Sequence, residues 1–177
     1  MTQNHEIYEQ LFAVQRSIRY HDRRVAHFDT LHKLTNVCTI FIAGIVILEL
    51  TGAKSPEWVK WFAAVAAILG AFDLVVGYGH RANQHRDLKR RFCVLERKLI
   101  QGDATQLQQL MGERSEIEAD EPPVLRALDA LCHNEMCAAS GLSRTNPEEC
   151  THFRKVHWFK HATANWFRWP NIGASAS

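Results

Sequence analysis

Two long apolar segments in the second quarter of the chain restrict its fold more than any other feature of the sequence. The first, about residues 34–51, has no charge before Glu49, and the second, about residues 58–79, is interrupted only by Lys60 and Asp73. A helix needs about 20 apolar residues to cross the roughly 30 Å hydrocarbon core of a bilayer. Helices of soluble proteins usually keep one polar face, whereas these segments are apolar all round. The sequence therefore predicts two membrane spans.

The connection between the spans and the charges beside them predict the topology. Residues 51–57 form a short connection with a glycine and a proline, so the two spans should form an antiparallel hairpin. Lysine and arginine accumulate on the cytoplasmic side of membranes. The loop side offers only Lys54 and Lys60, and ten basic residues flank the opposite ends of the spans: Arg16, Arg19, Arg23, Arg24, Lys33, Arg81, Arg86, Lys89, Arg90 and Arg91. We therefore expect both termini in the cytoplasm.

The carboxylate inside the second span predicts self-association. A charge facing lipid costs at least about 2.5 kcal/mol, so Asp73 should face protein or water. Small residues recur on the same stripe, where they allow helices to approach closely. Since two helices cannot enclose a carboxylate, we expect a homo-oligomer in which a polar ring lines a cation-favouring pore. The predicted pore-lining residues are Asp73, Asn36, Thr39, Ala66, Gly70 and Gly77. The alternative is a local pair between Asp73 and His80 or a nearby arginine.

The remaining sequence predicts cytoplasmic helices. Apolar residues at helical spacing indicate that the first span ends one long helix that starts near His5, and that the second continues to Gly102. Further helices are expected over residues 105–117 and 124–139. The predicted fold class is all-α: an integral membrane, two-helix transmembrane hairpin extended into a cytoplasmic helical bundle. Residues 1–102 form the hairpin with its extensions, and residues 103–177 form the cytoplasmic helices.

The last segment, residues 147–169, combines basic side chains with large aromatic ones. This composition suits an amphipathic helix on anionic lipid, contacts to a nucleotide or single strand, or packing of the aromatic rings on the protein's own helices. The basic cluster after the second span fits either membrane anchoring or an anionic ligand. The candidates for anion binding are Arg23, Arg24, Arg86, Lys89, Arg90, Arg91, Arg154, Lys155 and Lys160.

No pattern in the sequence indicates catalysis. The phosphate-binding, dinucleotide-binding, serine-hydrolase and zinc-protease motifs are absent from the sequence, so we expect no enzyme and no cofactor. Cys132, His133, Cys137, Cys150 and His152 do not match the usual zinc spacing, so no metal is expected. The formal net charge of +2 does not favour a double-stranded nucleic acid partner.

The chain resembles SLATT domains, small bacterial proteins with a membrane hairpin followed by cytoplasmic helices. The resemblance rests on the entry helix "RSIRYHDRRVAHFDTLHKLTNV", the polar exit "GYGHRANQHRDLKRRFCVLERKLI", the later "ALCHNEMCAASG" and the end "HWFKHATANWFRW". It implies a pore-forming effector of the bacterial inner membrane that acts in anti-phage defence by abortive infection. It also implies an associated nucleotidyltransferase-type enzyme that makes the nucleotide signal.

Together these observations lead to one functional hypothesis and one alternative. The hypothesis is a homo-oligomeric channel, with four subunits as the working number, gated by a cytoplasmic nucleotide or oligonucleotide. The alternative is a non-conducting membrane scaffold whose cytoplasmic helices recruit a partner.

Overall fold

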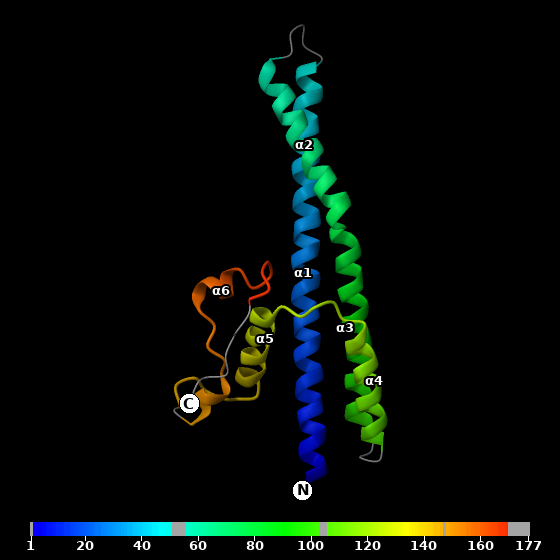
Figure 1. The fold of residues 1–177 in the computed structure, drawn as a ribbon, viewed down its shortest axis with the longest axis vertical. Helices are drawn as coiled ribbons and strands as arrows, with labels where there is room; N and C mark the ends of the chain where they lie inside the picture. The colour runs from blue at the N-terminus through cyan, green and yellow to red at the C-terminus, as the bar shows by residue number, and fades with distance from the viewer. Residues whose placement is uncertain (1, 51–55, 103–105, 147, 170–177) are drawn as a thin grey trace. The chain divides into compact units, whose positions relative to one another are not determined.

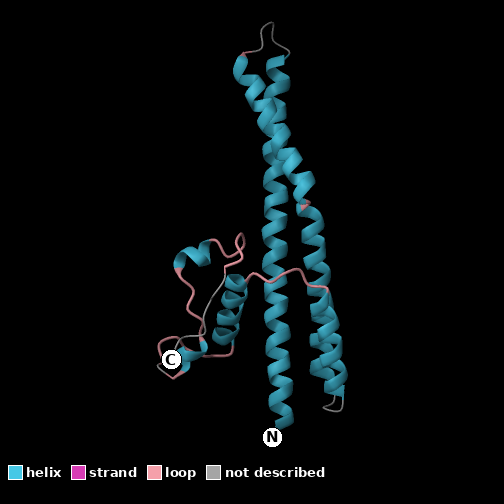
Figure 2. Ribbon diagram, viewed as in Figure 1, coloured by secondary structure: helices cyan, strands magenta, loops and turns pink. Residues whose placement is uncertain are grey.

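The computed structural model describes residues 2–50, 56–102, 106–146 and 148–169, and over these ranges it is helical and without strands (Figures 1 and 2). The elements in chain order are α1 (Thr2–Leu50), α2 (Glu57–Val76), α3 (Tyr78–Gln101), α4 (Leu107–Ala119), α5 (Arg126–Ala139), the 3-10 helix η2 (Glu149–His152) and α6 (Trp158–Ala162). The prediction of an all-helical fold is confirmed. Most of the predicted connection between the spans, residues 51–55, lies outside the described residues.

Internal contacts divide the chain into two units. One unit combines residues 1–24 with residues 85–177, and the other is residues 25–84, which contains both apolar segments. The division at residue 102 stays a prediction.

Unit 25–84 is a helical hairpin whose apolar side chains are largely exposed. Ile40 and Phe41 of α1 are 72% and 70% exposed, and Leu74 and Val75 of α2 are 84% and 83% exposed. Both helices are long and apolar enough to cross a bilayer. In water such a surface would be unfavourable by about 25 cal/mol for each Å² of apolar area left exposed. The exposed apolar residues are consistent with a membrane environment.

A break at Gly77 separates α2 from α3. Gly77 adopts the left-handed conformation, with φ 62° and ψ 51°, and its N–H donates to the Asp73 carbonyl at 2.9 Å. The Arg81 side chain donates to the Val76 carbonyl at 2.9 Å and so satisfies another end group of α2. Glycine adopts this conformation without the steric cost that a Cβ imposes. The second apolar helix therefore ends at Val76, three residues before the predicted end of the span.

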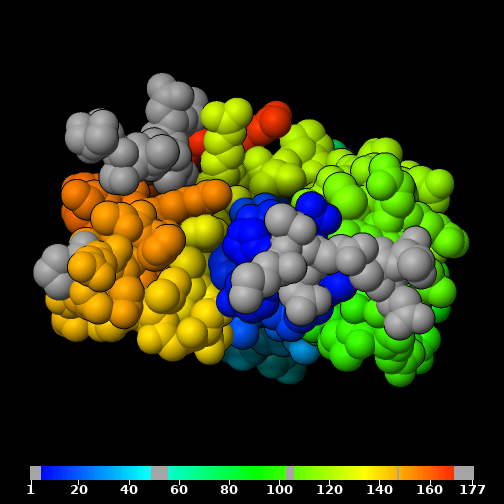
Figure 3. Space-filling view, turned by 90° about the horizontal axis from the view of Figure 1, so that it is seen from below, coloured from blue at the N-terminus to red at the C-terminus, as the bar shows by residue number. Residues whose placement is uncertain are grey.

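Two hydrophobic cores hold the other unit together, one on each side of α1. In the first, Val14 of α1 packs with α3 and α4 through Leu88, Phe92, Leu95, Leu99, Leu107, Leu110 and Ile117. In the second, Tyr20 of α1 packs with α5 and the C-terminal segment through Ala127, Leu128, Leu131, Cys132 and Ala164. Figure 3 shows α1 between these two groups when the unit is seen from its N-terminal end. The N-terminal part of α1 thus organises this unit.

A buried polar cluster joins α1, α3 and the segment before α5. His21 Nδ1 and His85 Nδ1 lie 2.9 Å apart, and His21 Nε2 lies 3.1 Å from the Glu121 carboxylate. His21 also stacks on Phe92, and the Tyr20 hydroxyl accepts a hydrogen bond from the Leu125 N–H at 3.0 Å. Burial raises the pKa of Tyr20. These contacts fix the crossing of residues 120–125 over α1, which Figure 1 shows.

The shorter helices follow the sequence closely until residue 141. Helices α4 and α5 begin two residues later than predicted. Gly141 follows α5 with φ 86°, as expected for the residue after a helix end, and the Leu142 N–H donates to the Cys137 carbonyl. The alternative of one amphipathic helix over residues 147–169 is wrong, because the described part of that segment holds only η2 and the five-residue α6.

Candidate functional site

Three polar side chains make a continuous hydrogen-bonded chain inside the hairpin. His32 Nδ1 of α1 lies 3.1 Å from Asp73 Oδ1 of α2, and His32 Nε2 lies 3.1 Å from the Asn36 side-chain amide. An imidazole protonated at Nδ1 satisfies both contacts, since it donates to the carboxylate and accepts from the amide. The Asp73 side chain is 20% exposed and that of His32 is 42% exposed. The carboxylate is therefore paired inside the hairpin, while the imidazole stays accessible.

The partner of Asp73 differs from the one that the sequence predicts. In the sequence Asp73 stands 19 residues after Lys54 and Asn36 stands 18 residues before that lysine, a count that predicts both at one level together with Thr39. The alternative prediction pairs Asp73 with His80 or an arginine. The structure pairs it with His32, about one helical turn before Asn36. The count assumed a residue-for-residue register, which helices that cross at an angle do not keep (Figure 1). Sequence reasoning thus found the carboxylate but missed the imidazole.

The other predicted pore-lining residues lie on different parts of the hairpin. The Thr39 hydroxyl is buried and has no hydrogen-bond partner among the described residues. Ala66 is half-buried, and a Cβ placed on Gly70 would meet no atom within 4 Å. Gly77 ends α2. Lining of a pore by these residues stays a prediction.

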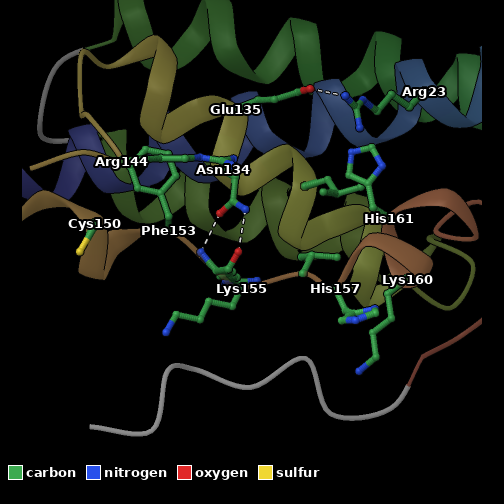
Figure 4. A pocket seen from close by; sticks show the side chains of 13 residues that line it. Arg23, Asn134, Glu135, Arg144, Cys150, Phe153, Lys155, His157, Lys160 and His161 are labelled. Atoms are coloured by element: carbon green, nitrogen blue, oxygen red, sulfur yellow. Dashed lines mark hydrogen bonds and ion pairs between the residues drawn. The ribbon is translucent and has the colours of Figure 1, made fainter. Parts of the chain in front are cut away.

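A basic cavity of about 680 Å³ lies in the unit of residues 1–24 and 85–177, between α1, α5 and residues 144 and 150–161. Its lining carries five lysine and arginine side chains and two histidines against a single carboxylate, that of Glu135. Figure 4 shows the labelled side chains around this space. The lining residues are Arg23, Leu131, Asn134, Glu135, Arg144, Cys150, Phe153, Arg154, Lys155, Val156, His157, Lys160 and His161.

A buried asparagine holds one wall of the cavity. The Asn134 amide of α5 donates to the Arg154 carbonyl at 2.8 Å and accepts from the Arg154 N–H at 2.7 Å (Figure 4). Asn134 is 4% exposed, so its amide is satisfied by the backbone of an otherwise irregular segment. Beside it the buried Phe153 ring lies under the Arg144 guanidinium, 5.0 Å from the ring centroid. These contacts position the basic residues that follow Arg154.

Ion pairs engage Arg23 and Arg154 of the cavity lining. Arg23 of α1 pairs with Glu135 of α5 (Figure 4). The Arg154 guanidinium lies 3.1 Å from Asp129, which also pairs with Arg16 at 3.1 Å. Lys155 makes no ion pair within the described residues. Arg23 and Glu135 are each more than a third exposed, so an anion can reach this pair from solvent.

The cysteines and histidines near the cavity form no metal site among the described residues. His133 Nε2 lies 3.0 Å from the His152 carbonyl and 3.5 Å from the Cys137 sulfur. Burial lowers the pKa of His133, which favours the neutral ring. Burial raises the pKa of the Cys132 thiol to about 12, and it also raises the pKa of Cys137. These thiols are therefore weak nucleophiles near neutral pH.

The structure brings together four of the nine predicted anion-binding residues and separates the others from them. Four line the cavity: Arg23, Arg154, Lys155 and Lys160. The Arg24 guanidinium instead donates to the Asn165 carbonyl at 2.7 Å. Lys89, Arg90 and Arg91 pair with Asp22, Asp87 and Asp120, and Arg86 is outside the cavity.

Sequence reasoning missed several residues of the cavity. Arg144, His157 and His161 line it, and Asn134 holds its wall. They come from irregular segments, from α5 and from the five-residue α6, so no periodicity links them. The one available signal was the absence of carboxylates after Glu149, so the basic residues of the C-terminal segment have no carboxylate close by in the sequence on that side.

No family model, curated protein or solved structure matches this chain.

Proposed function

We propose that this protein is a homo-oligomeric membrane channel that opens or closes when a phosphate-bearing ligand occupies the basic cavity. The observation that carries the proposal is the hydrogen-bonded chain of Asn36, His32 and Asp73, in which Asn36 and Asp73 belong to the two apolar segments and His32 stands two residues before the first segment. Polar side chains inside membrane segments are costly and commonly mark ion or proton pathways. Two helices do not surround such a pathway, so several copies of the hairpin form it.

The ligand class follows from the charge of the cavity. Five basic side chains, two histidines and one carboxylate favour a polyanion, and arginine forks bind phosphate in two-pronged geometry. The cavity volume of about 680 Å³ falls in the range typical of small-molecule sites. His157 and His161 add ring surfaces for a base. A nucleotide or short oligonucleotide fits this combination.

The cavity and the hairpin share one helix, which offers a route for gating. Arg23, in the cavity, and His32, in the polar chain, stand nine residues apart on α1. A ligand that takes Arg23 from Glu135 removes one contact between α1 and α5. Gating requires that the ligand bind the open and closed arrangements with different affinity.

The biological setting follows from the resemblance to SLATT domains. On that basis the channel acts in the bacterial inner membrane, with both termini in the cytoplasm, as an effector of anti-phage defence. Its ligand comes from an associated nucleotidyltransferase-type enzyme, and permeabilisation of the membrane stops growth of the infected cell.

Ion flux tests the channel directly. Full-length protein is reconstituted in liposomes loaded with a cation-sensitive dye, and ATP, cyclic dinucleotides and short oligoadenylates are added as probes. We expect ion flux that depends on one of these probes. We also expect Asp73→Asn to change the cation selectivity of this flux while the oligomer keeps its size. Loss of the oligomer in Asp73→Asn would instead assign Asp73 a structural role.

A matched pair of variants tests the ligand site. Lys155→Gln removes a cavity cation that has no ion-pair partner among the described residues, and Lys89→Gln removes a cation outside the cavity that pairs with Asp22. We expect only Lys155→Gln to weaken binding of the active probe, by about tenfold for one lost charged contact.

Absence of flux under every condition, together with an intact oligomer, would support the alternative of a non-conducting scaffold.

A further inference from the structure

The C-terminal segment presents a cluster of exposed aromatic rings. Trp158 is 73% exposed, Phe159 is 48% exposed, and Trp166 and Phe167 are each 58% exposed. Ring contacts connect Trp158 to Phe159 at 5.8 Å, and both Phe159 and Phe167 to Trp169 at 5.7 and 6.0 Å. We call Trp158, Phe159, Trp166 and Phe167 together the aromatic surface. Large aromatic side chains left exposed close together commonly mark an interaction site.

The backbone beneath the aromatic surface is fixed by the cytoplasmic unit. Ala164, in the middle of the segment, is 1% exposed and belongs to the core around Tyr20. The indole N–H of Trp169 donates to the Thr163 hydroxyl at 3.1 Å, and Arg24 of α1 donates to the Asn165 carbonyl. Because these contacts fix the backbone that carries the exposed rings, binding a partner through the rings costs little conformational entropy.

The charged residues of the C-terminal stretch itself have a single sign. The chain has no aspartate or glutamate after Glu149, whereas Arg154, Lys155, Lys160 and Arg168 lie in the same stretch. Tryptophan prefers the interface between lipid and water, where its ring is buried and its N–H stays solvated. Basic residues beside such rings are attracted to anionic headgroups.

We propose that the aromatic surface binds the anionic lipid headgroups of the membrane that holds the hairpin. A second copy of the chain is a poorer occupant, because it would set two basic segments against each other, and neither segment contains a carboxylate after Glu149. Arg24, which holds the segment at Asn165, stands ten residues before Leu34, where the first predicted span starts. None of the four rings lines the ligand cavity, although three basic residues of the same stretch do, and the lipid contact does not depend on channel activity.

Tryptophan quenching by lipid tests the proposal on the full-length chain. Trp58→Phe and Trp61→Phe remove the indoles of the hairpin, so that Trp158, Trp166 and Trp169 report on the C-terminal segment. The protein is reconstituted with brominated phosphatidylcholine, with or without phosphatidylglycerol, and acrylamide reports exposure to water. As a control, Met111→Trp places an indole on an exposed site of α4 after the three C-terminal tryptophans are replaced by phenylalanine.

We expect the C-terminal tryptophans to be quenched by brominated lipid when phosphatidylglycerol is present, with quenching reduced at high salt. Arg168→Gln, outside the cavity, should weaken the dependence on phosphatidylglycerol about fivefold, and the tryptophan at position 111 should stay unquenched by lipid. Quenching by acrylamide alone at every lipid composition would overturn the proposal. Protection from acrylamide without quenching by brominated lipid would also overturn it, since a second copy or another protein would then cover the rings.

Discussion

Removal of the Asn134 side chain should detach the wall of the basic cavity from α5. Asn134→Ala deletes both hydrogen bonds to Arg154 and leaves the Arg154 N–H and carbonyl without these partners. Two hydrogen bonds contribute about 1 kcal/mol each, and an unsatisfied buried group costs about 1–3 kcal/mol, so the variant should lose about 2–5 kcal/mol of stability. The loss should concentrate in residues 144–169.

The assay combines denaturation with limited proteolysis on detergent-solubilised, full-length protein. We expect the urea midpoint of the unit that contains α5 to fall and cleavage within residues 144–157 to accelerate. Probe binding at the cavity should fall with it, because Lys155 and Lys160 follow directly along the chain. Gln108→Ala, a polar residue on the exposed side of α4, serves as the control and should change the midpoint by less than about 0.5 kcal/mol.

A second substitution separates hydrogen bonding from packing. Asn134→Leu fills a similar volume but makes neither hydrogen bond, so it should be about as destabilising as Asn134→Ala. Full recovery of stability in Asn134→Leu would refute the reasoning, because volume alone would then explain the effect. An unchanged proteolysis pattern in Asn134→Ala would refute it as well, since the cavity wall would be held by other contacts.

Three further predictions concern the helix break, a buried histidine and the thiols. Gly77→Ala should cost about 1–2 kcal/mol, because a Cβ is strained at φ 62°, whereas Gly70→Ala, with open space around it, should leave the thermal midpoint of a single subunit unchanged. Burial lowers the pKa of His133, so the contribution of this residue to stability is complete above its usual pKa near 6.5 and is lost as pH falls towards the lower pKa of the folded state. Replacement of His133 by Gln should therefore flatten the dependence of stability on pH in that window. An unaltered dependence would argue against burial of the ring. With a pKa of about 12, Cys132 should resist iodoacetamide at neutral pH while the exposed Cys150 reacts, and mass spectrometry of the labelled peptides would expose the opposite order.

The sequence by itself determined the helices and the apolar hairpin. Runs of apolar residues and their 3.6-residue spacing are local properties, so they predicted α1, α4 and α5 to within a few residues. The glycines that end helices, Gly102 and Gly141, were likewise recognisable because they follow the last apolar positions of those helices. Basic residues beside the spans predicted an orientation for the same reason.

Only the tertiary structure decided which side chains meet. His32 and Asp73 are 41 residues apart, and Arg23 and Glu135 are 112 residues apart, so no spacing in the sequence links them. The last aromatic segment shows the same limit: its composition allowed lipid, ligand and core contacts, and the structure assigns Phe153 to the core and Lys155 to the cavity lining, with Trp158 left exposed. Hydrophobic periodicity predicts which face of a helix is buried, whereas the pairing of polar groups depends on how helices cross and where irregular segments are held.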